Sequence, residues 1–162
     1  MIVDRRAARM WTPARTCHRE DIEVRTPGGL VFVDLTGPLA DIVARSGIAE
    51  GLVSVQSLHT TAAIVVNENE PLLLQDLRAT LERAAPRHLT YRHDDFSQRG
   101  AVPPDEPANG HAHCQALLLR ASETLGVAGG RPRLGQWQRV FLVELDGPRA
   151  SREVHLQLTS GA

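Results

Sequence analysis

Two segments near the end of the chain alternate apolar and polar residues with the period of a β-strand. Their apolar positions are Trp137, Phe141, Val143 and Leu145 in the first segment, and Val154, Leu156 and Leu158 in the second. Successive side chains of a strand point to opposite faces, so each segment presents one apolar face. Asp146–Arg149 between them contains Gly and Pro and is typical of a turn. The pattern predicts a β-hairpin with one buried face, in which Trp137 is a core residue.

Four more strands are predicted in the first half of the chain. Two of them, at 15–25 and 30–35, are joined by a glycine turn at 27–29. The other two, at 51–58 and 61–66, are rich in Val and Ile. Because the segment at 61–66 has apolar residues on both faces, we expect it to be a central strand covered on both sides.

Apolar residues recur at helical spacing in three further segments. A short helix is predicted at 39–47, with Gly47 as its C-terminal stop. An amphipathic helix is predicted at 70–85 and another from about 111 to 125. The stretch at 93–109 has no hydrophobic period, and loops of that length are commonly lids or binding loops, or are otherwise disordered.

The composition excludes several classes of protein. A net charge of -1, with arginines scattered along 162 residues, is not that of a nucleic-acid-binding protein. The longest apolar runs, 62–66 and 116–119, are too short to cross a membrane. No apolar segment of an export signal follows the N-terminus, and Cys17 and Cys114 are too few and too far apart for a disulfide framework. We therefore expect one cytoplasmic domain with reduced thiols.

All 18 Lys and Arg positions are arginine, so Schiff-base chemistry through lysine is excluded. The residues that attract attention are histidines at element boundaries: His59, His93, and His111 with His113. Three imidazoles from separate segments can hold a zinc-like metal and leave a coordination position open. Equally, each can simply cap a turn. Since residues two apart point to nearly opposite sides of a helix, only one of His111 and His113 can face a common site.

Other polar motifs are open to both structural and functional interpretation. Asn69 is expected to be the N-cap of the following helix, whereas Glu68 can be a general base or an outer partner of a metal-bound water. The segment 135–138 can supply an amide and a ring to a pocket rim, against a core role for Trp137. Arg149 can bind a phosphate through its planar guanidinium, or be a solvated turn residue.

Taken in order, these segments resemble the YjbQ family, whose members are often described as secondary thiamine-phosphate synthases. The resemblance rests on His59–Ala62, Asn67–Asn69, His93–Asp94, Asn109–His113, Gly135–Gln138 and Asp146–Arg149. It spans nearly the whole chain. The loop at 96–108 departs from the acidic, glycine-rich loop that is usual in the family.

The resemblance implies a single α+β domain over residues 1–162, with a mainly antiparallel sheet or sandwich, two to three helices, and assembly as a homotrimer. It also implies a shared site with His59, His93 and His113 as ligands of a divalent metal, zinc more than Mg²⁺. Catalytic roles then fall to Glu68 and Asp94. Contacts to a small phosphorylated substrate fall to Thr60, Thr61, Asn67, Asn69, Gln138 and Arg149.

Two hypotheses of different classes follow. The first is an enzyme, a transferase that couples hydroxymethylpyrimidine diphosphate to a thiazole phosphate and releases pyrophosphate. Because a three-histidine site suits zinc better than Mg²⁺ and no lysine is present, this can be a side activity of a metal-dependent hydrolase or transferase. The second hypothesis is a trimeric protein that binds a small ligand or a metal without catalysis.

Overall fold

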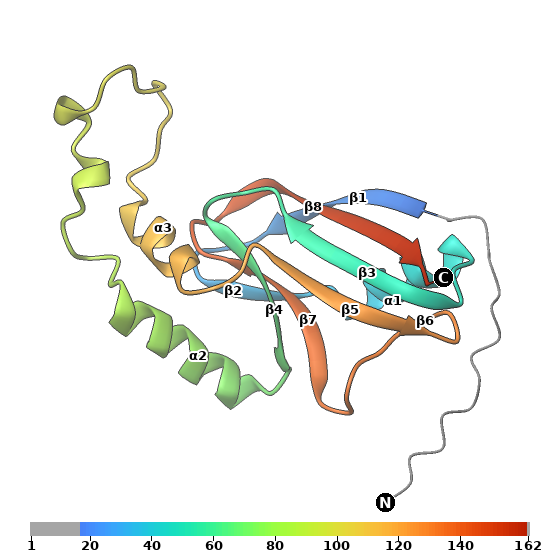
Figure 1. The fold of residues 1–162 in the computed structure, drawn as a ribbon. Coiled ribbons are helices and arrows are strands. Elements are labelled where there is room, and N and C mark those ends of the chain that lie inside the picture. The colour runs from blue at the N-terminus through green and yellow to red at the C-terminus, as the bar shows by residue number, and fades with distance from the viewer. Residues whose placement is uncertain (1–16, 162) are drawn as a thin grey trace, which may run out of the picture.

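The computed structural model describes residues 17–161 of the chain. Within these residues, eight strands form two antiparallel sheets, and three α-helices pack with them into one domain (Figure 1). The five-stranded sheet has the order β1-β8-β3-β5-β6, and the three-stranded sheet has the order β2-β7-β4. The predicted α+β fold with mainly antiparallel strands is therefore confirmed.

The five-stranded sheet contains β1 (Cys17–Thr26), β3 (Glu50–Ser57), β5 (Ser122–Ala128), β6 (Arg131–Pro132) and β8 (Arg149–Ser160). The three-stranded sheet contains β2 (Val31–Asp34), β4 (Ala62–Glu68) and β7 (Gln138–Glu144). The helices are α1 (Thr36–Ser46), α2 (Pro71–Ala84) and α3 (Gly110–Leu117). Two 3₁₀ turns, η1 (Arg92–Asp94) and η2 (Phe96–Gln98), lie between α2 and α3.

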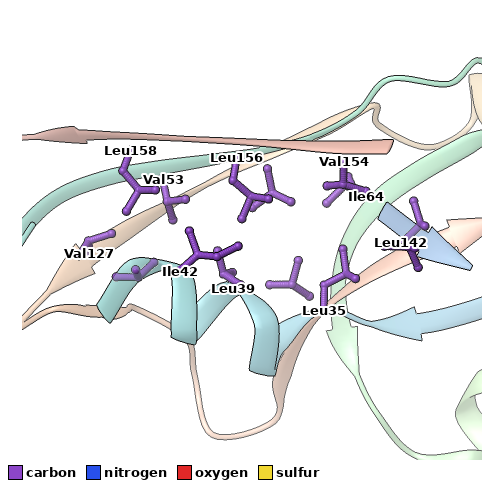
Figure 2. Packing of buried hydrophobic residues seen from close by; sticks show 14 of the residues in the cluster. Leu35, Leu39, Ile42, Val53, Ile64, Val127, Leu142, Val154, Leu156 and Leu158 are labelled. Atoms are coloured by element: carbon purple, nitrogen blue, oxygen red, sulfur yellow. The ribbon is translucent and has the colours of Figure 1, made fainter. Parts of the chain in front are cut away.

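The main hydrophobic core joins α1 to both sheets (Figure 2). Helix α1 contributes Leu39, Ile42 and Val43, each at most 1% exposed, because their helical spacing places them on one side. Gly47 ends this helix with φ of 70°, a left-handed conformation that costs glycine little. The predicted helix and its stop are confirmed.

A second, smaller apolar cluster joins the three-stranded sheet to α2 and α3. Its buried members are Ala63, Leu81, Ala112, Val143 and Leu145. Of these residues, Val143 lies on strand β7, and Val140 and Leu142 of this strand belong to the main core. Strand β7 is therefore covered on both faces, which is why its sequence is almost continuously apolar.

The predicted C-terminal hairpin is wrong, although both of its strands exist. β7 pairs with β2 and β4, whereas β8 pairs with β1 and β3 in the other sheet. The intervening turn thus crosses between sheets. The strands predicted at 15–25 and 30–35 are likewise found, as β1 and β2, in different sheets; residues 15 and 16 lie outside the described part. Alternation indicates a strand with a buried face but does not specify its partner.

Three local predictions also need correction. Trp137 is 64% exposed and precedes β7, so it is not a core residue. The helix expected at 111–125 ends at Leu117. Residues 122–128 instead form strand β5, in which Leu125 lies opposite Val53 of β3. The N-cap of α2 is Glu70, whose carboxylate accepts hydrogen bonds from the amides of Leu72 and Leu73 at 3.0 and 2.6 Å.

Candidate functional site

The three predicted histidines come from separate elements and lie at one end of the molecule. His59 lies between β3 and β4, His93 in η1, and His113 on α3. His59 and His113 line one groove of about 520 Å³. The ring of His93 packs edge-on against that of His113, with 4.6 Å between ring centroids. We call this hollow the histidine groove.

His59 is held by the main chain of β8. Its Nε2 accepts a hydrogen bond of 2.7 Å from the amide of Glu153, so the neutral ring carries its proton on Nδ1. Burial lowers the pKa of His59 below its ordinary value of 6.5, and the positive charge of Arg152 lowers it further. His59 is therefore a neutral imidazole at pH 7.

His113 is the histidine of α3 that faces the groove. Burial lowers its pKa, with a further contribution from His93 in the same direction. His111 is only 4% exposed, and its ring lies 6.4 Å from that of Tyr91. The inference from helix geometry, that only one of these histidines faces the groove, agrees with this arrangement.

The histidines of one chain do not fit the predicted zinc site. Zinc needs three or four ligand atoms at about 2.0–2.3 Å in tetrahedral directions. Among residues 17–161, no group of three or more His, Cys, Asp and Glu side chains is arranged to hold a metal ion. In addition, the Nε2 lone pair of His59 already accepts the Glu153 amide. Only His93 and His113 contact each other directly.

Asp94, one of the two predicted catalytic carboxylates, holds the start of α3 in place. Its Oδ1 accepts a hydrogen bond of 2.8 Å from the amide of Gly110. This bond satisfies one of the free amide groups of the first helical turn and joins η1 to α3. Asp94 thereby fixes the positions of the two elements that carry His93 and His113.

Asn109 and Arg149 both bind Asp146, in the connection between β7 and β8. The side-chain amide of Asn109 donates to Oδ2 of Asp146 at 2.8 Å, and the Arg149 guanidinium forms an ion pair with the same oxygen. Oδ1 of Asn109 is buried without a hydrogen-bond partner. Arg149 is only half-buried, so its guanidinium can still receive a ligand.

Thr60 and Thr61, predicted to bind substrate, have different surroundings. Thr60 is exposed and lines the histidine groove. Thr61 is 6% exposed, and its hydroxyl accepts a hydrogen bond of 3.0 Å from the guanidinium of Arg152. Of the two residues, Thr60 is the one placed to contact a ligand.

Arg152 and Glu144 form a buried ion pair behind the groove. The guanidinium binds the carboxylate through two bonds of 2.7 and 2.6 Å, and the two residues are 5% and 0% exposed. The hydroxyl of Thr26 and the backbone amide of Asp146 also donate hydrogen bonds to the Glu144 carboxylate, at 2.8 and 2.7 Å. Sequence reasoning missed this pair, yet its signal was present: Arg152 continues the inward alternation of β8, and Glu144 interrupts the apolar run of β7.

The remaining predicted site residues lie at the opposite end of β4. Asn67 and Glu68 end the seven-residue strand, and Gln138 is the register partner of Glu68. Asn69 donates to Asp34 at 3.0 Å. A strand of this length spans about 20 Å, so Glu68 does not reach the groove of its own chain. The structure thus divides the predicted site into a histidine end and an amide end.

Comparison with known proteins identifies the family. A family model described as UPF0047 protein YjbQ-like matches residues 20–161. This chain belongs to the YjbQ-like UPF0047 family. A UPF0047 protein of Methanothermobacter thermautotrophicus is 35% identical over 135 residues, which cover 83% of this chain and 87% of that protein. YugU of Bacillus subtilis is 28% identical over 130 residues, covering 79% and 89%.

Solved structures of YjbQ-like proteins have the same fold. A YbjQ-like protein of unknown function from Sulfolobus solfataricus superposes with a TM-score of 0.82 at 32% identity, covering 91% of this chain and all of the other. A hypothetical protein from Aeropyrum pernix gives a TM-score of 0.78 at 32% identity, covering 89% and 99%. None of the helices in residues 17–161 has the length and apolar character needed to span a bilayer.

The start of α3 tolerates no side chain at Gly110. A Cβ there would lie 2.4 Å from Cβ of Tyr91 and 3.2 Å from Oδ1 of Asp94. We expect Gly110→Ala to move α3 away from η1 and to cost about 1–3 kcal/mol, as overpacking does. Urea unfolding measures the loss. Gly100→Ala is the control, since nothing lies within 4 Å of a Cβ at that position; equal stability of the two variants would contradict the expectation.

Proposed function

We propose that this YjbQ-like protein is an enzyme that binds a small phosphorylated substrate in the histidine groove. The observation that carries the proposal is that two imidazoles with lowered pKa values, those of His59 and His113, line one groove. A neutral imidazole can accept a proton at pH 7. A volume of about 520 Å³ lies in the range of small-molecule sites.

Positive charge near the groove supports an anionic ligand. Arg152 and Arg149 both lower the pKa of His59, whereas the carboxylates of Glu144 and Glu153 raise it, so both guanidinium groups lie close enough to act on this ring. Arg152 is neutralised by Glu144 and is buried. Arg149 is the accessible one, and its planar guanidinium can bind two phosphate oxygens.

The reaction that we propose follows from the family resemblance. It is the transfer of the hydroxymethylpyrimidine group from its diphosphate to a thiazole phosphate, with release of pyrophosphate. Such a reaction needs cationic groups that stabilise the departing pyrophosphate. Of the two guanidinium groups that lower the pKa of His59, only that of Arg149 is accessible, and it is already paired with Asp146. We therefore propose that thiamine phosphate formation is a side activity of a transferase or hydrolase.

Turnover of the two precursors by purified protein tests the proposal. We expect His113→Asn to lower kcat about 100-fold or more, the effect of losing a general base. Arg149→Met should mainly raise KM. The control is His18→Gln, since His18 pairs with Glu20 on β1, the edge strand of the five-stranded sheet, and does not line the groove. Unchanged kinetics in His113→Asn would refute a catalytic groove.

A non-catalytic binding protein is the second candidate. It is favoured by the fact that neither predicted carboxylate lines the groove: Asp94 accepts a hydrogen bond from the Gly110 amide at the start of α3, and Glu68 lies at the other end of β4. Thermal shift with inorganic pyrophosphate separates the two candidates. Stabilisation without turnover of any phosphorylated compound favours binding alone. A rate that is unchanged in Glu68→Gln removes that residue from the mechanism.

The homotrimer is also a proposal. Large apolar side chains are exposed beside the groove, with Leu58 at 48% and Leu117 at 85%. The segment between α2 and α3 projects away from the two sheets (Figure 1). Exposed apolar groups of this kind commonly contact another subunit. Sedimentation velocity measures the oligomeric state.

The predicted metal needs a separate measurement. Elemental analysis of the purified protein measures its content of zinc and Mg²⁺.

A further inference from the structure

A carboxylate that the motifs did not single out lies beside the histidine pair. Oε1 of Glu106 is 3.8 Å from Nε2 of His93. Glu106 comes from the loop at 96–108, between η1 and α3. Its side chain is 24% exposed and that of His93 is 34% exposed, so both groups are partly shielded from water.

Arg99 fixes Glu106 in this position. Its guanidinium donates to Oε1 of Glu106 and to the backbone carbonyl of His93, each at 3.1 Å. The same guanidinium lies 5.7 Å above the ring of Phe96. One side chain therefore ties both ends of the loop together, and Glu106 cannot leave without losing this ion pair.

The Nε2 atom of His93 supplies a second, independent observation. It is buried and has no hydrogen-bond partner. A buried polar atom without a partner is rare and costly, so the site needs an acceptor or donor at this point. Glu106 is the carboxylate within 4 Å of it, and hydrogen bonds of functional sites are often long before a ligand binds.

We infer that Glu106 is a positioning residue: its carboxylate accepts a hydrogen bond from Nε2–H of His93 and thereby orients this ring against His113. The loop at 96–108 then supports the histidine that packs against His113 rather than being only a surface connection. In this arrangement, Nδ1 of His93 is left as the basic nitrogen of the ring. The inference concerns the orientation of His93 and holds whatever reaction the groove performs.

Nuclear magnetic resonance of the ¹⁵N-histidine-labelled full chain at neutral pH tests this inference. A ring N–H that donates to a carboxylate is protected from exchange with water, and its ¹H–¹⁵N signal becomes observable. We expect an Nε2–H signal of His93, assigned by its absence in His93→Phe. The signal should disappear in Glu106→Leu and weaken in Arg99→Met, which frees the carboxylate.

The matched control is Asp105→Asn, which removes a neighbouring exposed carboxylate from the same loop and should leave the signal unchanged. Circular dichroism confirms that each variant is folded. Absence of the signal in the wild type, or its persistence in Glu106→Leu, would overturn the inference. These readouts require no substrate, so a failure of the proposed enzyme activity leaves them interpretable.

Discussion

Arg152→Met is expected to lower the free energy of unfolding by about 3–5 kcal/mol, the effect of leaving one charge of a buried pair without its partner. Glu144 is 0% exposed, and two of its hydrogen bonds come from Arg152. Methionine has a similar volume but no charge, so the variant leaves a carboxylate in the core. Urea unfolding monitored by circular dichroism measures the loss.

The double variant Glu144→Gln/Arg152→Met is the control for this explanation. It removes both charges, whereas the amide of Gln can still contact Thr26 and the Asp146 amide. We expect it to be more stable than Arg152→Met alone, because no unpaired charge remains. The single variant Glu144→Gln completes the comparison. If the double variant loses as much free energy of unfolding as the two single variants together, the interaction between the two charges contributes nothing to stability.

The same pair gives a pH dependence with a defined sign. Burial alone would raise the pKa of Glu144, but hydrogen bonds from Arg152, Asp146 and Thr26 together hold it below its ordinary value of 4.5. Its contribution to stability is therefore present above about pH 4.5 and is lost as the pH falls through the lower folded pKa. In Arg152→Met, burial dominates and raises this pKa, so the contribution should reverse and decline as the pH rises. Unfolding curves at pH 4 and pH 7 for both proteins check the reversal.

Gly147→Ala is expected to be comparably disruptive, at about 3 kcal/mol or more, because the added carbon meets backbone rather than a mobile side chain. A Cβ at Gly147 would lie 1.8 Å from the carbonyl oxygen of Gly28. The connection between β7 and β8 would have to move, and with it Asp146 and Arg149. We expect a lower unfolding midpoint and, if the groove binds inorganic pyrophosphate, weaker binding by calorimetry.

Gly28→Ala is the matched control at the same contact. A Cβ on Gly28 meets nothing within 4 Å, although its carbonyl is the group that Gly147 approaches. We therefore expect a change of stability within about 0.5 kcal/mol, as at ordinary surface positions. Similar losses in Gly28→Ala and Gly147→Ala would show that glycine flexibility, and not the close approach, is what the fold requires.

Much of the candidate site could be predicted because its residues stand at element boundaries. His59, His93 and His113 were singled out for that reason, and the structure brings all three to one end of the molecule. Glu106 could not be found in this way, because it belongs to a loop without a hydrophobic period. Its relation to His93 depends on how Arg99 folds that loop.

The sequence by itself determined the elements that have a clear period: strands β1 to β4, β7 and β8, and the helices α1 and α2. Helix geometry showed that only one of His111 and His113 can face a common site, and the family resemblance implied that it is His113. Period is a local property, since it depends only on neighbours along the chain. Strand pairing is not local. Only the tertiary structure placed β7 and β8 in different sheets, separated Glu68 from the histidines by the length of β4, and buried Glu144 against Arg152. Each of these depends on which surfaces are buried together, and a one-dimensional pattern does not contain that information.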